Sequence, residues 1–335
     1  MNSQTQARLF GYSQAFADPA TRLLVGIIVV VLVTAGVAIG ILAASKIIGP
    51  NLKSELFKRY FAWLIIVPLM IGPVLLGAAW AILAITILSL LCYREFARAT
   101  GLFREKLISL FVVIGILLLN FAALDNWYGF FVALNSLCVG IIAVITILRD
   151  RPQGYIQRVA LSVFAFMLFG VCLSHLSYMA NDPHYRAILI MLVMTVELND
   201  VFAFCVGKTL GRHKLAPNTS PNKTIEGSLG AAILTTILVT WLGHNVFYQS
   251  PLDDLPHLIG LGLIISLVGQ LGDLLLSSIK RDLSIKDMGT TIPGHGGFLD
   301  RTNSLLLVAP AVFHYVGYFV GFGLDQQKRI FSAGW

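Results

Sequence analysis

The feature that most constrains this chain is a series of apolar segments separated by short polar stretches. Each is about 18 residues or longer, enough for a helix to cross a hydrocarbon core of roughly 30 Å. The predicted fold class is therefore all-α, a polytopic transmembrane helix bundle of about ten spans. The expected spans are residues 23–44, 60–76, 77–98, 106–123, 127–148, 159–179, 186–206, 229–247, 257–279 and 305–323.

The second and third spans come from one unbroken apolar run, Phe61 to Tyr93. That run is too long for one ordinary membrane helix. It contains Gly72-Pro73 and Gly77, residues that commonly form turns. We predict two helices here; a single helix would invert the topology upstream of it.

The composition excludes an ordinary soluble enzyme. Hydrophobic residues make up 57% of the chain and charged residues only 12%, whereas soluble domains carry roughly 25% charged residues. No polar stretch reaches about 40 residues, so none is long enough to fold readily as a separate soluble domain. Any chemistry must therefore lie on the membrane bundle.

The net charge of +7 does not indicate nucleic-acid binding, because the basic residues lie in loops beside apolar segments. There they report topology and attraction to anionic membrane lipids. The four cysteines lie in or beside apolar runs, which indicates packing rather than disulfides or metal ligands. We expect no cleavable signal peptide, because the first 22 residues are mixed and amphiphilic.

The distribution of Lys and Arg predicts the topology, since cytoplasmic loops hold the excess of these residues. Alternate loops carry 19 of the 24 basic residues. This places both termini outside and the two longest polar loops, 207–228 and 280–304, in the cytoplasm. The compact loops favour a bacterial inner membrane.

The two halves of the chain differ in their polar chemistry. Residues 1–185 are expected to be N-terminal membrane helices with little site chemistry. Residues 186–335 are expected to be C-terminal membrane helices that carry the catalytic residues. The functional prediction therefore concerns the second region.

Asp273 is the clearest candidate in that region, because a carboxylate within a membrane helix is costly unless it faces a partner or water. Ser266, Gln270, Asp273, Ser277 and Lys280 are spaced by three or four residues, which puts them on one helical face. This polar stripe descends from the cytoplasmic surface. A structural seam between helices is the alternative interpretation.

A second cluster, Glu197, Asn199 and Asp200, ends an apolar run on the same side. It is followed by residues 207–212 and 220–227, which mix glycines, basic residues and hydroxyls. Such groups can bind phosphate oxygens. A helix cap and a solvated basic loop are the alternatives.

The third cluster, residues 277–304, is the most distinctive. Its oxygen donors suit a hard cation such as Mg²⁺, and its Lys and Arg side chains suit phosphates. The oxygen donors are Asp287, Asp300 and Asn303, together with Asp273 just upstream, and the cations are Lys280, Arg281, Lys286 and Arg301. His295 is either a turn residue or a direct participant. Together the clusters indicate metal-dependent phosphoryl or nucleotidyl transfer to an amphiphile at the cytoplasmic mouth of the bundle.

The third cluster closely resembles the signature of the CTP:phosphatidate cytidylyltransferase (CDP-diacylglycerol synthase) family. The matching residues are Ser278, Lys280-Arg281, Lys286-Asp287, Pro293 to Gly297 and Asp300-Arg301. The stretches from Asn199 to Gly207, from Ser220 to Gly227 and from Gly272 to Leu274 also look like that family. The resemblance covers roughly residues 195–310, while upstream only hydropathy fits.

The resemblance implies that CTP and phosphatidate react to give CDP-diacylglycerol and pyrophosphate, with Mg²⁺ and, as a second candidate ion, a monovalent cation such as K⁺. It implies metal ligation by Asp273 and Asp300, with Asn303 as a third candidate. The other implied catalytic residues are Lys280, Arg281, Asp287 and His295. The implied substrate-binding residues are Asn199, Asp200, Lys208, Ser220, Lys223, Thr224, Glu226, Lys286, Gly294, Gly296, Gly297 and Arg301.

For Asp273 and Asp300 to converge, the signature loop must fold back onto helix 257–279. One departure from the family pattern is Asn303, which stands where the signature has aspartate. This replacement removes one negative charge and is expected to weaken or retune metal binding.

Several alternatives stay open at this stage. The chain could be a CTP-dependent lipid-alcohol kinase, a cytidylyltransferase for another lipid phosphate, a proton- or cation-coupled transporter, or an inactive lipid-binding paralogue. No internal repeat of the kind common in transporters is visible. The expected partners are CTP, a lipid phosphate and membrane lipids, with no nucleic acid, and both a monomer and a homodimer are compatible with the sequence.

Overall fold

The computed structural model describes residues 3–45, 49–148, 150–291, 296–322 and 329–332. Over these ranges ten helices are long and apolar enough to cross a membrane. This confirms the predicted all-α, multi-pass membrane fold. The helices are α2 (Pro19–Ala44), α3 (Pro50–Leu76), α4 (Ala78–Thr100), α5 (Lys106–Leu124), α6 (Tyr128–Ile147), a sixth span from Tyr155 to Met179, α9 (Tyr185–Leu210), α10 (Ile225–Val246), α11 (Leu255–Asp282) and α12 (Phe298–Val320).

The sixth span is a composite of three segments. It consists of α7 (Tyr155–Ala165), a π-helical stretch (Phe166–Cys172) and α8 (Leu173–Met179). Gly170 lies in the π-helical stretch, where an added Cβ would meet the Phe166 ring at 3.0 Å. The π-helical stretch therefore lies where the backbone packs tightly against an aromatic ring.

The long apolar run splits into two helices, as predicted. Gly77 separates α3 from α4 and has φ 148°, a conformation that L side chains rarely adopt. A Cβ at Gly77 would also meet the Leu9 carbonyl oxygen of the short helix α1 (Ser3–Phe10) at 2.3 Å. Gly72 and Pro73 lie inside α3, so the turn is at Gly77 alone.

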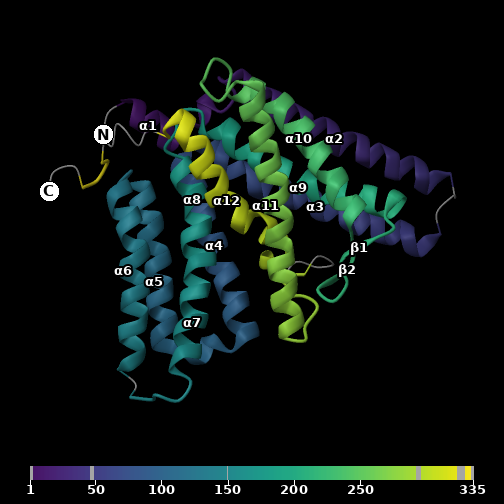
Figure 1. Cartoon of the computed structure of the whole chain (residues 1–335). Helices are drawn as coiled ribbons and strands as arrows, with labels where there is room; N and C mark the ends of the chain where they lie inside the picture. The colour runs from purple at the N-terminus through teal and green to yellow at the C-terminus, as the bar shows by residue number, and fades with distance from the viewer. Residues whose placement is uncertain (1–2, 46–48, 149, 292–295, 323–328, 333–335) are drawn as a thin grey trace.

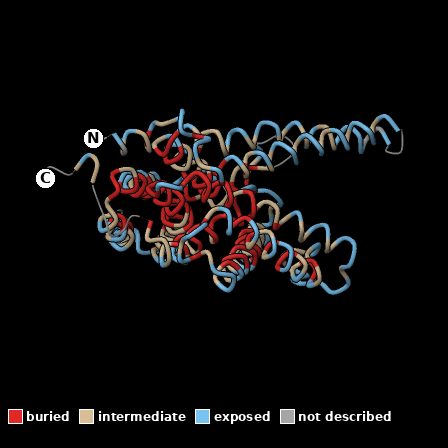
Figure 2. The backbone as a smooth tube through the Cα atoms, turned by 90° about the horizontal axis from the view of Figure 1, so that it is seen from above, coloured by how far each residue is buried: buried red, intermediate tan, exposed pale blue. Residues whose placement is uncertain are grey.

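Helices α2 and α3 form a hairpin that extends beyond the buried centre of the molecule (Figures 1 and 2). In each, only 6% of the most apolar 18-residue window is buried. Asp18 caps the start of α2 by accepting hydrogen bonds from the backbone N–H groups of Ala20 and Thr21. Lipid, rather than protein, is the expected environment of this apolar hairpin.

Helices α9 to α12 pack closely, because small residues stand where they cross. An added Cβ at Gly262 of α11 would lie 2.6 Å from the Cα of Thr236 in α10. A Cβ at Gly272 would lie 2.7 Å from the Asn303 carbonyl oxygen in α12. This second crossing brings the neighbouring residue, Asp273, against α12.

A two-stranded antiparallel hairpin, β1 (Lys214–Ala216) and β2 (Ser220–Thr224), connects α9 to α10. It lies at the start of α10, near α11 (Figure 1). Thr224 ends β2 and caps α10, its hydroxyl oxygen accepting a hydrogen bond from Gly227 N at 3.1 Å. The strands are an addition to the predicted fold, in which this segment was expected to be a loop.

Candidate functional site

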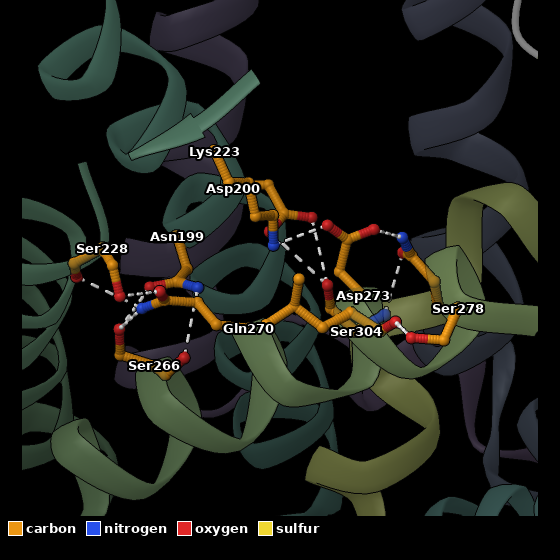
Figure 3. Close-up of polar contacts among 11 residues, drawn as sticks. Asn199, Asp200, Lys223, Ser228, Ser266, Gln270, Asp273, Ser278 and Ser304 are labelled. Carbon is orange, nitrogen blue, oxygen red and sulfur yellow. Dashed lines mark hydrogen bonds and ion pairs between the residues drawn. The ribbon is translucent and has the colours of Figure 1, made fainter. Parts of the chain in front are cut away.

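Asp273 is the centre of one group of polar side chains. Lys223 Nζ of β2 lies 2.6 Å from Asp273 Oδ2, and both side chains are about one-fifth exposed, at 19% and 20%. The Asn303 amide of α12 donates a hydrogen bond to Asp273 Oδ1. Three elements far apart in sequence thus converge on this carboxylate (Figure 3).

Asp200 of α9 lies beside this group. Its carboxylate accepts a hydrogen bond from the Ser304 hydroxyl at 3.1 Å. It also interacts electrostatically with Asp273 and Lys223. Asp200 and Lys223, both from the second polar cluster of the sequence, therefore lie beside Asp273 of the polar stripe. We call Asp200, Lys223, Asp273, Asn303 and Ser304 the Asp273 cluster.

A polar seam lies deeper in the bundle and joins α9, α10 and α11. Asn199 Oδ1 accepts hydrogen bonds from Thr235 at 2.9 Å and Ser266 at 2.6 Å. The Gln270 amide donates to Ser266 and to the Ser228 carbonyl. Asn199 is fully buried, which favours a role in helix packing; its predicted contact with substrate stays a prediction.

Asp300 is the centre of a second group, at the start of α12. Lys280 Nζ of α11 lies 3.0 Å from Asp300 Oδ1. Asp300 Oδ2 accepts hydrogen bonds from Met288 N at 2.9 Å and Gly297 N at 3.0 Å. Together with the Asn303–Asp273 contact, these bonds confirm that the signature region folds back onto α11.

The glycines of the signature region are explained by this packing. Gly296 has φ 81°, and its added Cβ would lie 2.9 Å from Asp300 Oδ2. Gly297 approaches a different carboxylate, that of Glu95, whose Oε2 would lie 2.3 Å from an added Cβ. Gly294 and His295 lie outside the described residues, so their predicted roles stay predictions.

Glu95 of α4 is a residue that the sequence analysis missed. Its carboxylate accepts hydrogen bonds from the Thr291 hydroxyl at 2.8 Å, Phe298 N at 3.1 Å and Leu299 N at 2.9 Å. Glu95 is an acidic residue near the end of an apolar run, and an acid in a membrane helix is costly without a partner, as argued for Asp273. The same argument would have identified Glu95 as a candidate. It was overlooked because the first half of the chain was expected to carry little site chemistry.

Two further predicted residues, Glu226 and Arg281, make contacts with the β hairpin and the residues beside it. Glu226 accepts hydrogen bonds from Arg212 N at 3.0 Å and from His213 Nδ1 at 2.6 Å, which closes the ends of the β hairpin. Arg281 Nε donates to the Thr219 carbonyl at 3.2 Å and ties α11 to the hairpin turn. Lys208, Lys286, Asp287 and Arg301 are exposed and Ser220 is half-buried, and their predicted roles stay predictions.

The donor chemistry of the Asp273 cluster fits a hard cation. The Asp273 carboxylate pairs with the Lys223 ammonium, and the Asp200 carboxylate interacts electrostatically with both. Carboxylate oxygens suit Mg²⁺. The Asn303 amide oxygen is turned elsewhere, accepting from Ser304 N at 2.8 Å. Among the described residues no group of three or more His, Cys, Asp or Glu side chains is arranged to hold a metal ion. Metal ligation by Asp273, Asp300 and Asn303 stays a prediction.

The fold and these charged groups define a multi-pass membrane protein that gathers cations and carboxylates beside a β hairpin between its C-terminal helices. The chain belongs to the cytidylyltransferase family, whose family model matches residues 57–319. This match confirms the family that the signature residues resemble.

Individual relatives agree with this membership. The chain is 30% identical over 251 residues to the uncharacterized protein YnbB of Escherichia coli (strain K12), covering 73% of this chain and 82% of that protein. It is 34% identical over 221 residues to the phosphatidate cytidylyltransferase of Bacillus subtilis (strain 168), covering 64% and 81%. It is 40% identical over 139 residues to the phosphatidate cytidylyltransferase of Synechocystis sp. (strain ATCC 27184 / PCC 6803 / Kazusa), covering 41% and 45%.

Proposed function

We propose that this chain is a Mg²⁺-dependent phosphatidate cytidylyltransferase that faces the cytoplasm. In the reaction, a phosphate oxygen of phosphatidate attacks the α-phosphorus of CTP. The new P–O bond gives CDP-diacylglycerol, and the bond to the β-phosphate oxygen breaks to release pyrophosphate. Family membership and the named relatives support nucleotidyl transfer.

The observation that carries the proposal is the pair of lysine–carboxylate contacts, Lys223–Asp273 and Lys280–Asp300. The charge of each lysine is paired with that of a carboxylate, and the lysine side chain can bind a phosphate oxygen instead when substrate is present. Phosphoryl-group transfer needs mainly positioning and charge neutralisation. Lys223 and Lys280 would hold phosphate oxygens beside Asp273 and Asp300, about two turns apart along α11.

Asp273 and Asp200 would hold Mg²⁺, because they are the two carboxylates of the Asp273 cluster. Bound Mg²⁺ supplies charge neutralisation at the phosphates of CTP. Asn303 would orient Asp273 through its amide donor. Asp300 would hold Lys280 and the signature backbone in place.

The surroundings of the Asp273 cluster suit a lipid substrate. Phe204 and Leu229 are 65% and 60% exposed. Phe204 lies one turn after Asp200 in α9, and Leu229 lies in the first turns of α10, which follows the β hairpin. Lys208 Nζ lies 5.7 Å from the centre of the Phe204 ring. A basic residue above an exposed apolar surface matches a lipid with a phosphate headgroup.

The test is incubation of the purified protein in detergent with Mg²⁺ and CTP labelled at the α- or the γ-phosphorus, in separate reactions with phosphatidate, with a lipid alcohol and with another lipid phosphate. We expect α-label in the lipid and release of pyrophosphate, with both lost in Asp273→Asn. Transfer of γ-label to a lipid alcohol with release of CDP would instead identify a lipid kinase. Transfer of α-label only to another lipid phosphate would overturn phosphatidate as the substrate.

A further inference from the structure

Glu95 links the first half of the chain to the signature region. It lies on α4 and is only 7% exposed, yet none of its contacts described above is within α4. Thr291 precedes the signature glycines, whereas Phe298 and Leu299 follow them. One carboxylate therefore holds both sides of the segment between residues 291 and 298.

The backbone around Glu95 is built to admit this side chain. An added Cβ at Gly289 would meet Glu95 Oε1 at 2.7 Å, and one at Gly297 would meet Oε2 at 2.3 Å. One turn earlier on α4, Cys92 Sγ lies 3.3 Å from the Thr302 hydroxyl. Helix α4 and the start of α12 thus contact each other over two successive turns.

The same contacts use backbone N–H groups at the N-terminus of α12. Helix N-terminal N–H groups can bind phosphate when nothing else uses them. Here Gly297 N donates to Asp300, and Phe298 N and Leu299 N donate to Glu95. Substrate phosphates are therefore left to the side-chain cations, and the start of α12 serves as a fixed support for Asp300.

We propose that Glu95 is a positioning residue that anchors the signature segment and thereby fixes Asp300 opposite Lys280. This inference rests on the proposed function, because it assigns Glu95 a part in the same site. Asp300 accepts from Gly297 N, and Gly297 is followed directly by the two residues that Glu95 holds. A shift of the α12 start would move Asp300 relative to Lys280, and misplacement of about 1 Å can cost roughly 10²-fold in rate.

The experiment compares Glu95→Gln with the wild type and with Glu55→Gln. Gln keeps the shape of Glu95, but its amide nitrogen cannot accept a hydrogen bond. Glu55 provides the matched control, because its exposed carboxylate pairs with Arg59 within α3. Thr291→Val, which removes only the hydroxyl donor, tests the other side of the segment without changing Glu95.

Two experiments are made on each purified full-length protein. The first measures amide hydrogen exchange of residues 288–299, and the second measures kcat per folded molecule and KM for CTP. In Glu95→Gln we expect exchange at Phe298 and Leu299 to rise by at least about tenfold. We expect kcat to fall by at least about tenfold while KM changes less. Thr291→Val should show a smaller change of the same kind, and Glu55→Gln none.

The outcomes separate this proposal from the proposed function. Unchanged exchange at residues 298 and 299 in Glu95→Gln would overturn the anchoring role, whatever the activity. Faster exchange with wild-type kcat per folded molecule would overturn the positioning role. A wild type that does not transfer CMP to phosphatidate would count against the proposed function alone, and exchange would still decide whether Glu95 anchors the segment.

Discussion

The environments of Asp273 and Asp300 differ although the two residues look equivalent in the sequence. The Asp273 side chain is 20% exposed and faces a lysine and an amide. The Asp300 side chain is 4% exposed and accepts two backbone hydrogen bonds as well as an ion pair. Asp273 is therefore available to ligands, whereas Asp300 is already used to hold the start of α12 and Lys280 in place.

The largest expected effect is that of Asp273→Asn. This change removes the negative charge that we assign to the metal site, and turnover should fall by roughly 10³-fold or more. The purified protein should lose less stability than Asp300→Asn does, because the Asp273 carboxylate accepts no backbone hydrogen bond among the contacts described above. Turnover and thermal unfolding in detergent check the two parts.

Asp282→Asn is the matched control for Asp273→Asn, because Asp282 is exposed at the end of the same helix. It should behave as the wild type in both measurements. Near-normal turnover of Asp273→Asn, or of Asp273→Ala, would show that the metal assignment is wrong.

Asp300→Asn should also abolish most of the turnover, but it should lower stability at the same time. It removes a buried ion pair with Lys280, which costs about 3–5 kcal/mol, and it weakens a helix cap, which adds roughly 0.5–2 kcal/mol. The same purified samples, unfolded by heat, check this contrast. An Asp300→Asn protein that is as stable as the wild type but inactive would make Asp300 resemble Asp273 and remove the distinction.

Much of this architecture could be predicted from the sequence. Apolar segment length determines helices in a bilayer, and Gly77 is a residue that can turn where its neighbours cannot. The fold-back of the signature region was predicted from the need for Asp273 and Asp300 to converge on one metal ion; the structure shows the fold-back and places the two carboxylates in separate polar groups. The helices, the turn at Gly77 and the fold-back each depend on local sequence or on one motif, so the sequence alone was enough to predict them.

The contacts of Glu95 and Asn303 could not be predicted in the same way. Glu95 and Leu299 are separated by more than 200 residues, and no helical periodicity relates positions so far apart. The role of Asn303 depends on which way its amide faces, and hydrogen-bond partners decide that orientation. The partner Asp273 Oδ1 becomes known only with the packing of α11 against α12, whereas Ser304 N belongs to the next residue of the same helix.

Asn303→Asp tests how the activity and stability of the Asp273 cluster depend on Mg²⁺. The change replaces a hydrogen-bond donor with a second carboxylate beside Asp273, so we expect tighter Mg²⁺ binding and lower stability without Mg²⁺. Activity at low Mg²⁺ should be maintained or raised, and Mg²⁺ should raise the unfolding temperature more than in the wild type. A clear loss of activity at every Mg²⁺ concentration would mean that the site depends on the amide donor.

Asn199→Ala should have the smallest effect on catalysis, although Asn199 directly precedes Asp200. It removes an acceptor shared by Thr235 and Ser266 within the polar seam, and hydrogen bonds between membrane helices contribute about 0.6–2 kcal/mol. We therefore expect a stability loss of about 1 kcal/mol with KM for CTP and kcat within about twofold of the wild type. Thr235→Val, which removes one donor to the same atom, is the control and should be destabilised less. A rise in KM for CTP in Asn199→Ala without loss of stability would restore Asn199 as a substrate-binding residue, and would show that the ligand-accessible region around Asp273 extends one residue further along α9.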